Sequence, residues 1–348
     1  MKSIYDFFIF RVIIVAFCLF GIASAYTQDL EKECESIYQS LWIDKDANRI
    51  ESVEKTLEIA KTYLKKCNDI KGKEEVRAFI AKQIPKIEQK IKELEVNNLI
   101  ETFNKSIPAK NWDLAFASGK DFLSKHPDYI LDVSLVLASI GFDRAVENPP
   151  IDKYNNEAIN YAKTALQLMN EGKVSATGRY GAFQYYYKNE KCPDGVINAI
   201  GWMNYTIGYI MFVRQKQTKE AVSYLYKSTQ IGCETKNFSE VYRLIGDWYF
   251  DEVIKLKDLR VEKLKSTSQE TNETKSILAL QKGFVNRAVD AYARAYQISS
   301  RWLDNSSTPV LRKKLEELQG DFADSYLKTV INTPFIDPAT PVVPIPEN

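Results

Sequence analysis

The fold of this chain is decided by Tyr242-Arg-Leu-Ile-Gly-Asp-Trp-Tyr249 and Ala288-Val-Asp-Ala-Tyr-Ala-Arg-Ala295. In the first stretch, aromatic, apolar and small residues recur at i, i+3, i+4 and i+7 and share one stripe of an α-helix: Tyr242, Ile245, Gly246 and Tyr249. In the second, Ala288, Tyr292 and Ala295 repeat that spacing. A glycine opposite alanines lets two helix backbones approach closely, with the tyrosines filling the space beside the contact. The two stretches therefore predict a closely packed pair of helices.

This pair resembles the two helices of a tetratricopeptide repeat. The family's signature is an aromatic-x-x-Leu-Gly-x-x-Tyr helix followed by an Ala-x-x-x-aromatic-x-x-Ala helix. The chain departs from the family in its spacing, because about thirty extra residues separate the two halves. The resemblance implies an architecture and a role in binding proteins or peptides, and it implies no reaction.

A second match to the repeat lies between Asn111 and Pro127. Its spacing resembles the second helix of a tetratricopeptide repeat, with a proline just past the helix end, and the matching residues are Ala115, Gly119, Phe122 and Pro127. The segment Phe122-Leu-Ser-Lys-His-Pro-Asp128 also matches Tyr63-Leu-Lys-Lys-Cys-Asn-Asp69 earlier in the chain. These two segments predict an internal repeat.

The composition favours an all-α chain. Glycine and proline are sparse, at 14 and 12 of 348 residues, whereas leucine, alanine, lysine and glutamate are abundant. Helical patterns recur over residues 26–332 and pair into antiparallel hairpins. We therefore expect one all-α domain over residues 26–332, in which helical hairpins stack into a tetratricopeptide-like α-solenoid. An irregular helical array is the alternative.

The hairpin that contains the two opening stretches is expected to be unusually long. Its first helix continues through Leu264, the polar residues 266–274 form the turn, and the second helix returns over residues 276–299. Such an amphipathic pair has to bury its apolar stripe. The arms bury it against each other, fold it back over the solenoid, or leave it for a partner helix. The first alternative is favoured, because paired helices bury most of their own stripe.

Residues 73–104 form a long, charged, amphipathic segment. Its stripe alternates steps of four and three residues, through Ile80, Ile84, Ile87, Ile91, Leu94 and Asn98. That spacing fits a coiled-coil seam, although packing against a neighbouring helix is the more common cause. Pro85 is expected to kink this segment or to begin a new helix as its first residue.

Residues 1–25 resemble a secretory signal peptide. Lys2 and Arg11 supply positive charge, residues 12–22 form the apolar stretch, and Ala23-Ser-Ala25 fits a cleavage site. The apolar stretch is short for a membrane span. We expect an exported chain that begins at Tyr26, in the periplasm or outside the cell, with no stable membrane span after cleavage. An uncleaved N-terminal anchor is the alternative.

Export changes what the cysteines mean. The four in the expected mature chain contain no CxxC pair and have no histidine at metal-ligand spacing, which disfavours zinc: Cys34, Cys67, Cys192 and Cys233. An even number in an oxidising compartment suggests two disulfides. The predicted pairs, Cys34–Cys67 and Cys192–Cys233, each join the start of a hairpin's first helix to the end of its second, because antiparallel helices bring those ends together. Buried free thiols are the alternative.

Little in the sequence points to catalysis. His126 is the only histidine, and its place before Pro127 suits a surface residue near a helix end better than a catalytic base. The chain contains no GxSxG elbow, HExxH motif, phosphate loop or EF-hand loop. Lys and Arg number 47 against 46 Asp and Glu, so the overall charge does not favour nucleic acid. We expect no enzyme activity, no cofactor, no metal site and no nucleic-acid partner.

One loop and the C-terminal tail complete the chain. Aromatic residues cluster in the loop 172–195, at Tyr180, Phe183, Tyr185, Tyr186 and Tyr187. Three consecutive tyrosines face more than one side of any helix or strand, so they form either a surface for a ligand or partner or a loop packed over the repeats. Residues 333–348 contain five prolines and are expected to be extended and disordered.

These observations favour a non-catalytic exported scaffold that binds a protein or peptide partner through a helical-repeat surface. The alternative is a periplasmic or secreted binding protein that takes a small molecule or glycan in a tyrosine-rich groove formed by loop 172–195. A hydrolase with an unrecognised site is disfavoured by the single histidine and by the missing motifs.

Overall fold

The structure is a computed structural model, which describes residues 29–41, 48–175, 192–231, 233–267, 269–302, 304, 306–319, 327 and 329–346. Within these residues the chain is all-helical and has no β-strand, which confirms the expected all-α class. The chain divides into two compact units, with the boundary between Lys125 and His126. Each unit has a cluster of buried apolar residues of its own.

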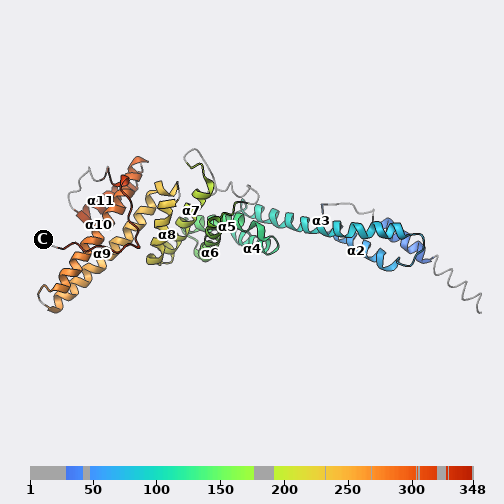
Figure 1. The fold of residues 1–348 in the computed structure, drawn as a ribbon, viewed down its shortest axis with the longest axis horizontal. Helices are drawn as coiled ribbons and strands as arrows, with labels where there is room; N and C mark the ends of the chain where they lie inside the picture. The colour runs from blue at the N-terminus through green and yellow to red at the C-terminus, as the bar shows by residue number, and fades with distance from the viewer. Residues whose placement is uncertain are drawn as a thin grey trace, which may run out of the picture. The chain divides into compact units, whose positions relative to one another are not determined.

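The first unit contains the helical residues 29–40 and the helices α2 (Ile50–Lys66), α3 (Glu74–Ser106) and α4 (Trp112–Lys125), as Figure 1 shows. Helix α2 packs on α3, and α3 packs on α4. One cluster of buried residues in this unit consists of Cys34, Leu41, Ala60, Tyr63, Cys67, Ile70 and Ile80. The predicted stripe of α4 faces inward, since Ala115 and Phe122 are fully buried.

Helix α3 runs without interruption through Pro85, so the expectation that Pro85 begins a new helix is wrong. Contacts on both sides of the proline hold the helix in place, because Ile80 belongs to the core and Glu88 pairs with Lys61 of α2 at 2.8 Å. Helix α3 packs against α2 and α4. In the predicted seam Ile80 and Leu94 are buried, whereas Ile84, Ile87 and Ile91 are partly exposed and Asn98 is exposed.

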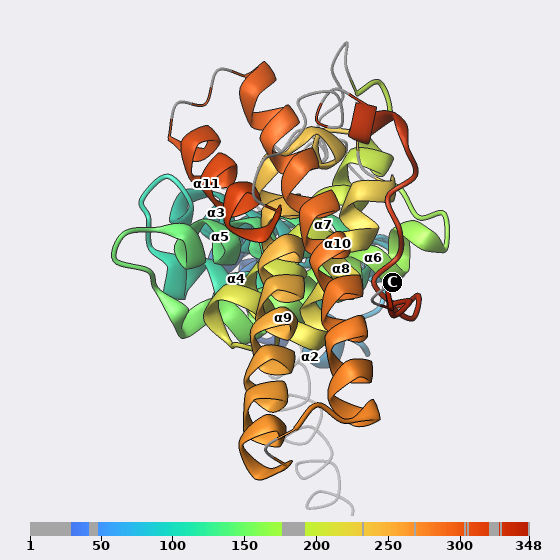
Figure 2. The same ribbon diagram turned by 90° about the vertical axis from the view of Figure 1, so that its left-hand side faces the viewer.

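In the part of the second unit that the structure describes, seven α-helices follow one another along the chain (Figure 2): α5 (Ile130–Val146), α6 (Asn155–Asn170), α7 (Gly195–Tyr209), α8 (Thr218–Ile231), α9 (Ser239–Thr267), α10 (Asn272–Arg301) and α11 (Ser307–Gln319). Each of these helices packs on the next one along the chain. A π-helical turn, Ile210–Arg214, extends α7. The stretch Gly195–Arg214 is long and apolar enough to cross a membrane, but 67% of its apolar window is buried inside the protein, as in a core helix.

Three helix pairs of this unit share one contact, in which a glycine of the first helix faces a side chain of the second. The pairs are Gly141 with Ala158, Gly208 with Leu225, and Gly246 with Tyr292. The partners are 17 positions apart in the first two pairs and 46 apart in the third, so the three hairpins share this contact at different separations along the chain. The expectation that Gly246 faces alanines is wrong. A Cβ at Gly246 would lie 2.7 Å from the ring of Tyr292, because that ring fills the contact.

The long hairpin forms as expected from the sequence. Helix α9 continues through Leu264 to Thr267, and α10 returns from Asn272 to Arg301. The turn between them is shorter than the expected 266–274, because a capping box ends it. The Thr274 amide donates to Thr271 Oγ1 at 3.2 Å, and the Thr271 amide donates to Thr274 Oγ1 at 2.9 Å, which satisfies amides that the start of α10 would otherwise leave unbonded.

The C-terminal tail differs from the expectation of disorder. It is extended, as its prolines predict, but it contacts α8, α9 and α10 through Tyr226, Tyr242 and Arg294, and Figure 2 shows the tail running beside α10. Val330 and Phe335 are buried, and the Ile345 amide donates to the carbonyl of Ala279 at 2.8 Å. The proline content alone suggests disorder, whereas the aromatic and aliphatic side chains between the prolines hold the tail on the helices.

Candidate functional site

The face of α8, α9 and α10 that holds the tail contacts it through aromatic rings, hydroxyl groups and guanidinium groups. We term it the tail-binding face and define it by Tyr226, Tyr242, Gly283, Arg287 and Arg294. The three α10 residues fall at i, i+4 and i+11 and therefore share one stripe of the helix. Because α8, α9 and α10 pack in succession, the two tyrosines come to lie beside the Arg294 end of that stripe.

Phe335 is the aromatic anchor of the tail. Its side chain is buried, with ring centroids 5.3 Å from Tyr242 and 5.8 Å from Tyr226. The guanidinium of Arg294 lies over the same ring, 4.9 Å from its centroid. Aromatic pairs and cation–π contacts at these separations each add to the energy of apolar burial. Phe335 is therefore held on several sides by the tail-binding face.

Arg294 and Tyr226 also bind the backbone next to the anchor. Arg294 Nη2 donates to Thr333 Oγ1 at 3.0 Å and to the Pro334 carbonyl at 3.3 Å. The Tyr226 hydroxyl donates to the Phe335 carbonyl at 3.2 Å. Arg294 is itself oriented by Asp290, one helical turn earlier, whose carboxylate accepts from Nε and Nη2 at 3.2 Å. Two donors thus recognise successive carbonyls of an extended chain.

A glycine lets the last part of the tail approach α10. A Cβ at Gly283 would collide with the Val343 carbonyl and would lie 2.7 Å from a side-chain carbon of Val342. The Arg287 guanidinium reaches the Thr340 carbonyl only at 3.5 Å. Gly283 is thus the position at which the tail backbone crosses the helix.

The tail turns between its two attached parts. The Thr340 amide donates to the Asp337 carbonyl at 2.9 Å, and the Ala339 amide donates to the Asp337 side chain at 2.8 Å, as in a turn begun by aspartate and proline. Before this turn, Phe335 is buried while the adjacent Ile336 is 47% exposed, so the anchor points into the face and its neighbour points to solvent.

Burial keeps the tyrosines of this region neutral. It raises the pKa of Tyr242 to about 12 and that of the neighbouring Tyr249 to about 12. The same cause raises the pKa of Tyr226. The Tyr242 hydroxyl donates to the Lys236 carbonyl at 3.0 Å. The Tyr242 and Tyr226 hydroxyls therefore act as neutral hydrogen-bond donors to backbone carbonyls.

A second polar cluster, centred on Asp247, ties three helices together. Its carboxylate accepts from the Tyr292 hydroxyl of α10 at 2.6 Å and from the Lys314 ammonium of α11. Arg243 pairs with Asp247 and with Glu240 on α9. Burial, followed by the charge of Asp247, raises the pKa of Tyr292. The charges in this cluster are paired with one another, so it serves packing.

The residues predicted to pack the repeats are in the protein interior, with one exception. Buried are Tyr242, Ile245, Gly246, Tyr249, Ala288, Tyr292, Ala295, Ala115, Gly119 and Phe122. Pro127 is exposed and begins the short 3₁₀ turn that follows α4. The aromatic residues proposed as a ligand or partner surface, Tyr180, Phe183, Tyr185, Tyr186 and Tyr187, lie outside the described residues, as do residues 1–25.

The cysteines lie in the pairs expected from the sequence. The Cα atoms of Cys34 and Cys67 are 5.9 Å apart, and those of Cys192 and Cys233 are 5.7 Å apart, within the range that a disulfide spans. Cys67 directly follows α2, and Cys192 precedes α7. Each pair therefore closes the ends of a helical hairpin, as expected.

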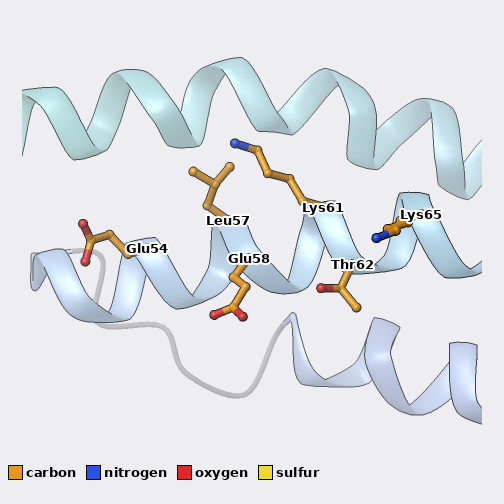
Figure 3. Close-up of a pocket in the computed structure, with 6 residues that line it drawn as sticks. All are labelled: Glu54, Leu57, Glu58, Lys61, Thr62 and Lys65. Atoms are coloured by element: carbon orange, nitrogen blue, oxygen red, sulfur yellow. The ribbon is translucent and has the colours of Figure 1, made fainter.

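Other parts of the described chain offer no comparable site. Among those residues, no group of three or more His, Cys, Asp or Glu side chains is placed to hold a metal ion. A shallow hollow on α2 is lined by Glu54, Leu57, Glu58, Lys61, Thr62 and Lys65, and Figure 3 shows Leu57 and Lys61 pointing toward α3. Two acidic and two basic residues line it, and Lys61 is paired with Glu88. This hollow is part of the helix–helix surface.

Sequence reasoning missed the tail-binding face, although two signals were present. Thr-Pro-Phe-Ile-Asp-Pro338 places two large apolar residues inside a proline-rich segment, which is unusual for a disordered tail. Arg294 stands in the small-residue stretch of α10, where a buried charge requires partners. Neither signal reveals that the two meet, because 39 residues separate Arg294 from Thr333.

The fold and this site define a class of protein. In the described residues it is all-helical, it has two pairs of cysteines at disulfide distance, and one helical face holds an extended segment of the chain. Comparison with protein-family models, with curated proteins and with solved structures gave no match. The function is therefore argued from the geometry of the chain itself.

Proposed function

We propose that this protein is a non-catalytic exported scaffold that binds a protein or peptide partner through the helical surface of its second unit. The proposal includes a tetratricopeptide-like α-solenoid with one extended hairpin as its architecture. It is supported by helices that pack on their neighbours in sequence and by the glycine contact that recurs in three hairpins.

One observation carries the proposal: the tail-binding face already holds an extended segment of chain. Arg294 and Tyr226 donate to successive carbonyls, and Phe335 fills an aromatic site. Backbone recognition combined with a side-chain anchor is the way in which proteins bind extended peptides. A partner segment of this kind is therefore compatible with the surface.

Export is the second part of the proposal. Two cysteine pairs at disulfide separation suit an oxidising compartment, the periplasm or the extracellular space. The sequence of residues 1–25 supports removal of a signal peptide before Tyr26. N-terminal sequencing of exported protein tests this, and an intact Met1 terminus in the membrane fraction contradicts it.

Crosslinking in the native envelope tests the binding function. A photoreactive amino acid replaces Asn286, which is exposed on α10 next to Arg287 of the tail-binding face, and a second variant carries it at Glu54 of the first unit as control. We expect a discrete protein to crosslink at position 286 and not at position 54. The alternative, a small molecule or glycan bound by Tyr180, Phe183 and residues 185–187, predicts a ligand-induced rise in Tm and no crosslinked protein.

A further inference from the structure

We propose that residues 333–346 are a resident ligand of the tail-binding face, and that the partner is an extended, proline-flanked peptide segment whose aromatic residue takes the place of Phe335. This inference rests on the proposed function, since it names the chemistry of the partner at the same site. It makes the C-terminal tail a segment that the partner has to displace.

The tail contacts the protein as a bound peptide does, through its backbone and one anchor side chain, and most of its side chains are not buried as they would be in a core segment. Arg294 and Tyr226 donate to the carbonyls of Pro334 and Phe335, which every peptide possesses. One side chain, Phe335, is buried in aromatic surroundings, whereas Ile336 is 47% and Val343 74% exposed. Another segment with an aromatic residue at the anchor position can therefore make the same contacts.

Proline suits such a ligand for two reasons. It restricts the backbone before binding, so that less conformational entropy is lost when the segment is ordered. It also lacks an N–H group, so the tail leaves fewer amides that need partners. The Ile345 amide, between Pro344 and Pro346, is satisfied by the Ala279 carbonyl.

The resident tail leaves polar groups of the protein unsatisfied. The Tyr249 hydroxyl and Arg287 Nη1 are buried and have no hydrogen-bond partner among the described residues. Tyr249 lies close enough to Arg287 and to Asp337 of the tail for both charges to act on it. An unbonded buried donor costs free energy. A partner that presents a carbonyl or carboxylate here therefore gains bonds that the tail does not make.

This difference favours a foreign segment over the tail of a second copy. The tethered tail has a high effective concentration at its own site, and an identical tail from another copy brings no additional bond. A segment with an acceptor for Tyr249 and Arg287 does bring one. The chemistry of the partner is thus an aromatic residue next to proline, followed by an acceptor group.

The test compares full-length Phe335→Ala with Ile336→Ala, a neighbouring exposed position that serves as matched control. The probe is a fluorescent synthetic peptide of residues 331–346, and its binding is measured by anisotropy. We expect the Phe335→Ala chain to bind it at least about tenfold more tightly than wild type and Ile336→Ala. A probe in which Phe335 is itself alanine should bind at least about tenfold more weakly.

Hydrogen exchange and circular dichroism provide the second readout. In Phe335→Ala, the Ile345 amide should exchange faster while the helical signal is unchanged. Equal binding of the probe by wild type and Phe335→Ala overturns the proposal, and so does loss of the fold in Phe335→Ala, because a displaceable ligand is not required for folding. If wild type forms concentration-dependent dimers and Phe335→Ala does not, the occupant of the face is the tail of a second copy and the proposal of a foreign segment is wrong.

The outcome is separable from that of the proposed function. If Phe335→Ala binds the probe but no protein crosslinks in the envelope, the peptide site stands and the scaffold function fails. If a protein is captured equally by wild type and by Phe335→Ala and the probe binds neither chain, the scaffold function stands and the displaced-tail proposal fails.

Discussion

The position of a residue around α10 decides whether its side chain contacts the core or the tail. Tyr292 and Arg294 are two positions apart and therefore project in different directions. Tyr292 meets Gly246 and Asp247 of α9, whereas Arg294 meets Phe335 and its neighbours in the tail. One helix thus serves the packing of the hairpin and the recognition of an extended segment.

The burial of Tyr292, followed by the nearby charge of Asp247, predicts how stability depends on pH. Because the pKa of Tyr292 is raised above 10.0 in the folded state, its contribution is fully present below pH 10 and is lost as pH rises through the folded value. Tyr242 and Tyr249, with pKa values of about 12, act in the same direction. We expect the free energy of unfolding to fall above about pH 10.

Tyr292→Phe is the variant that tests this dependence. Its loss of a bond to a carboxylate should cost about 1.5–3 kcal/mol at pH 8, and the decline between pH 8 and pH 11 should be shallower than in wild type. Urea titrations at the two pH values measure both effects. An unchanged decline would contradict the assignment to Tyr292.

Adding a methyl group at two glycines of the second unit is expected to have different consequences. At Gly246 the new Cβ would meet the ring of Tyr292 inside the hairpin, so Gly246→Ala should lower the free energy of unfolding by about 1–3 kcal/mol. At Gly283 the new Cβ would meet the tail backbone, so Gly283→Ala should release residues 342–346 and leave the hairpin intact. Urea titration and hydrogen exchange of both variants distinguish the two, and equal losses of stability would contradict this assignment.

Among the helices, α9 and α10 show how an insertion is accommodated. The two arms pack against each other, as favoured from the sequence, and the tail covers part of α10 near Ala279 and Gly283. The apolar side chains that remain on the surface of α9 are Ile254, Leu259 and Val261, each 39–44% exposed. The inserted residues therefore form a helical pair, and its α10 arm also lengthens the surface that contacts the tail.

Replacing residues 256–282 by a short Gly/Ser turn tests the role of the insertion. The contact between Gly246 and Tyr292 lies outside the deleted residues, so we expect the rest of the unit to keep its helical signal. The Ala279 carbonyl is removed, so the Ile345 amide should exchange faster while Phe335 remains seated on Tyr226 and Tyr242. A shortened chain that does not fold would show that the arms belong to the core.

At the scale of the whole molecule, each compact unit has its own core and its own cysteine pair. Cys34–Cys67 lies in the first unit and Cys192–Cys233 in the second. The closed loops span 33 and 41 positions. Each disulfide therefore constrains the unfolded chain of one unit.

Removing one cysteine pair at a time tests this division. Cys34→Ser with Cys67→Ser should lower the stability of the first unit by about 3–4 kcal/mol in the chain-entropy account, with hydrogen exchange in α5–α10 unchanged. The double variant at Cys192 and Cys233 should have the reverse effect and is the matched control. Free thiols at all four positions, found by mass mapping of unreduced peptides, would contradict the pairing.

The sequence by itself determined the all-helical class, the long hairpin, the cysteine pairs and the burial of the repeat stripes. These features depend on the periodicity of apolar residues and on the signals that begin and end helices, and both are set by residues close together in the sequence. Tyr242, Ile245 and Tyr249 are buried because helical spacing places them on one face. Local order is sufficient to predict such features.

Only the tertiary structure decided that the chain has two cores, that Gly246 faces Tyr292, that α3 continues through Pro85, and that the tail is seated. Each depends on residues that meet across long separations, such as Tyr226 and Phe335, which are 109 positions apart. Composition describes the tail as proline-rich and carries no information about the aromatic and arginine side chains that receive it. The site exists because α8, α9 and α10 bring these side chains to one face, and packing, not local pattern, creates that face.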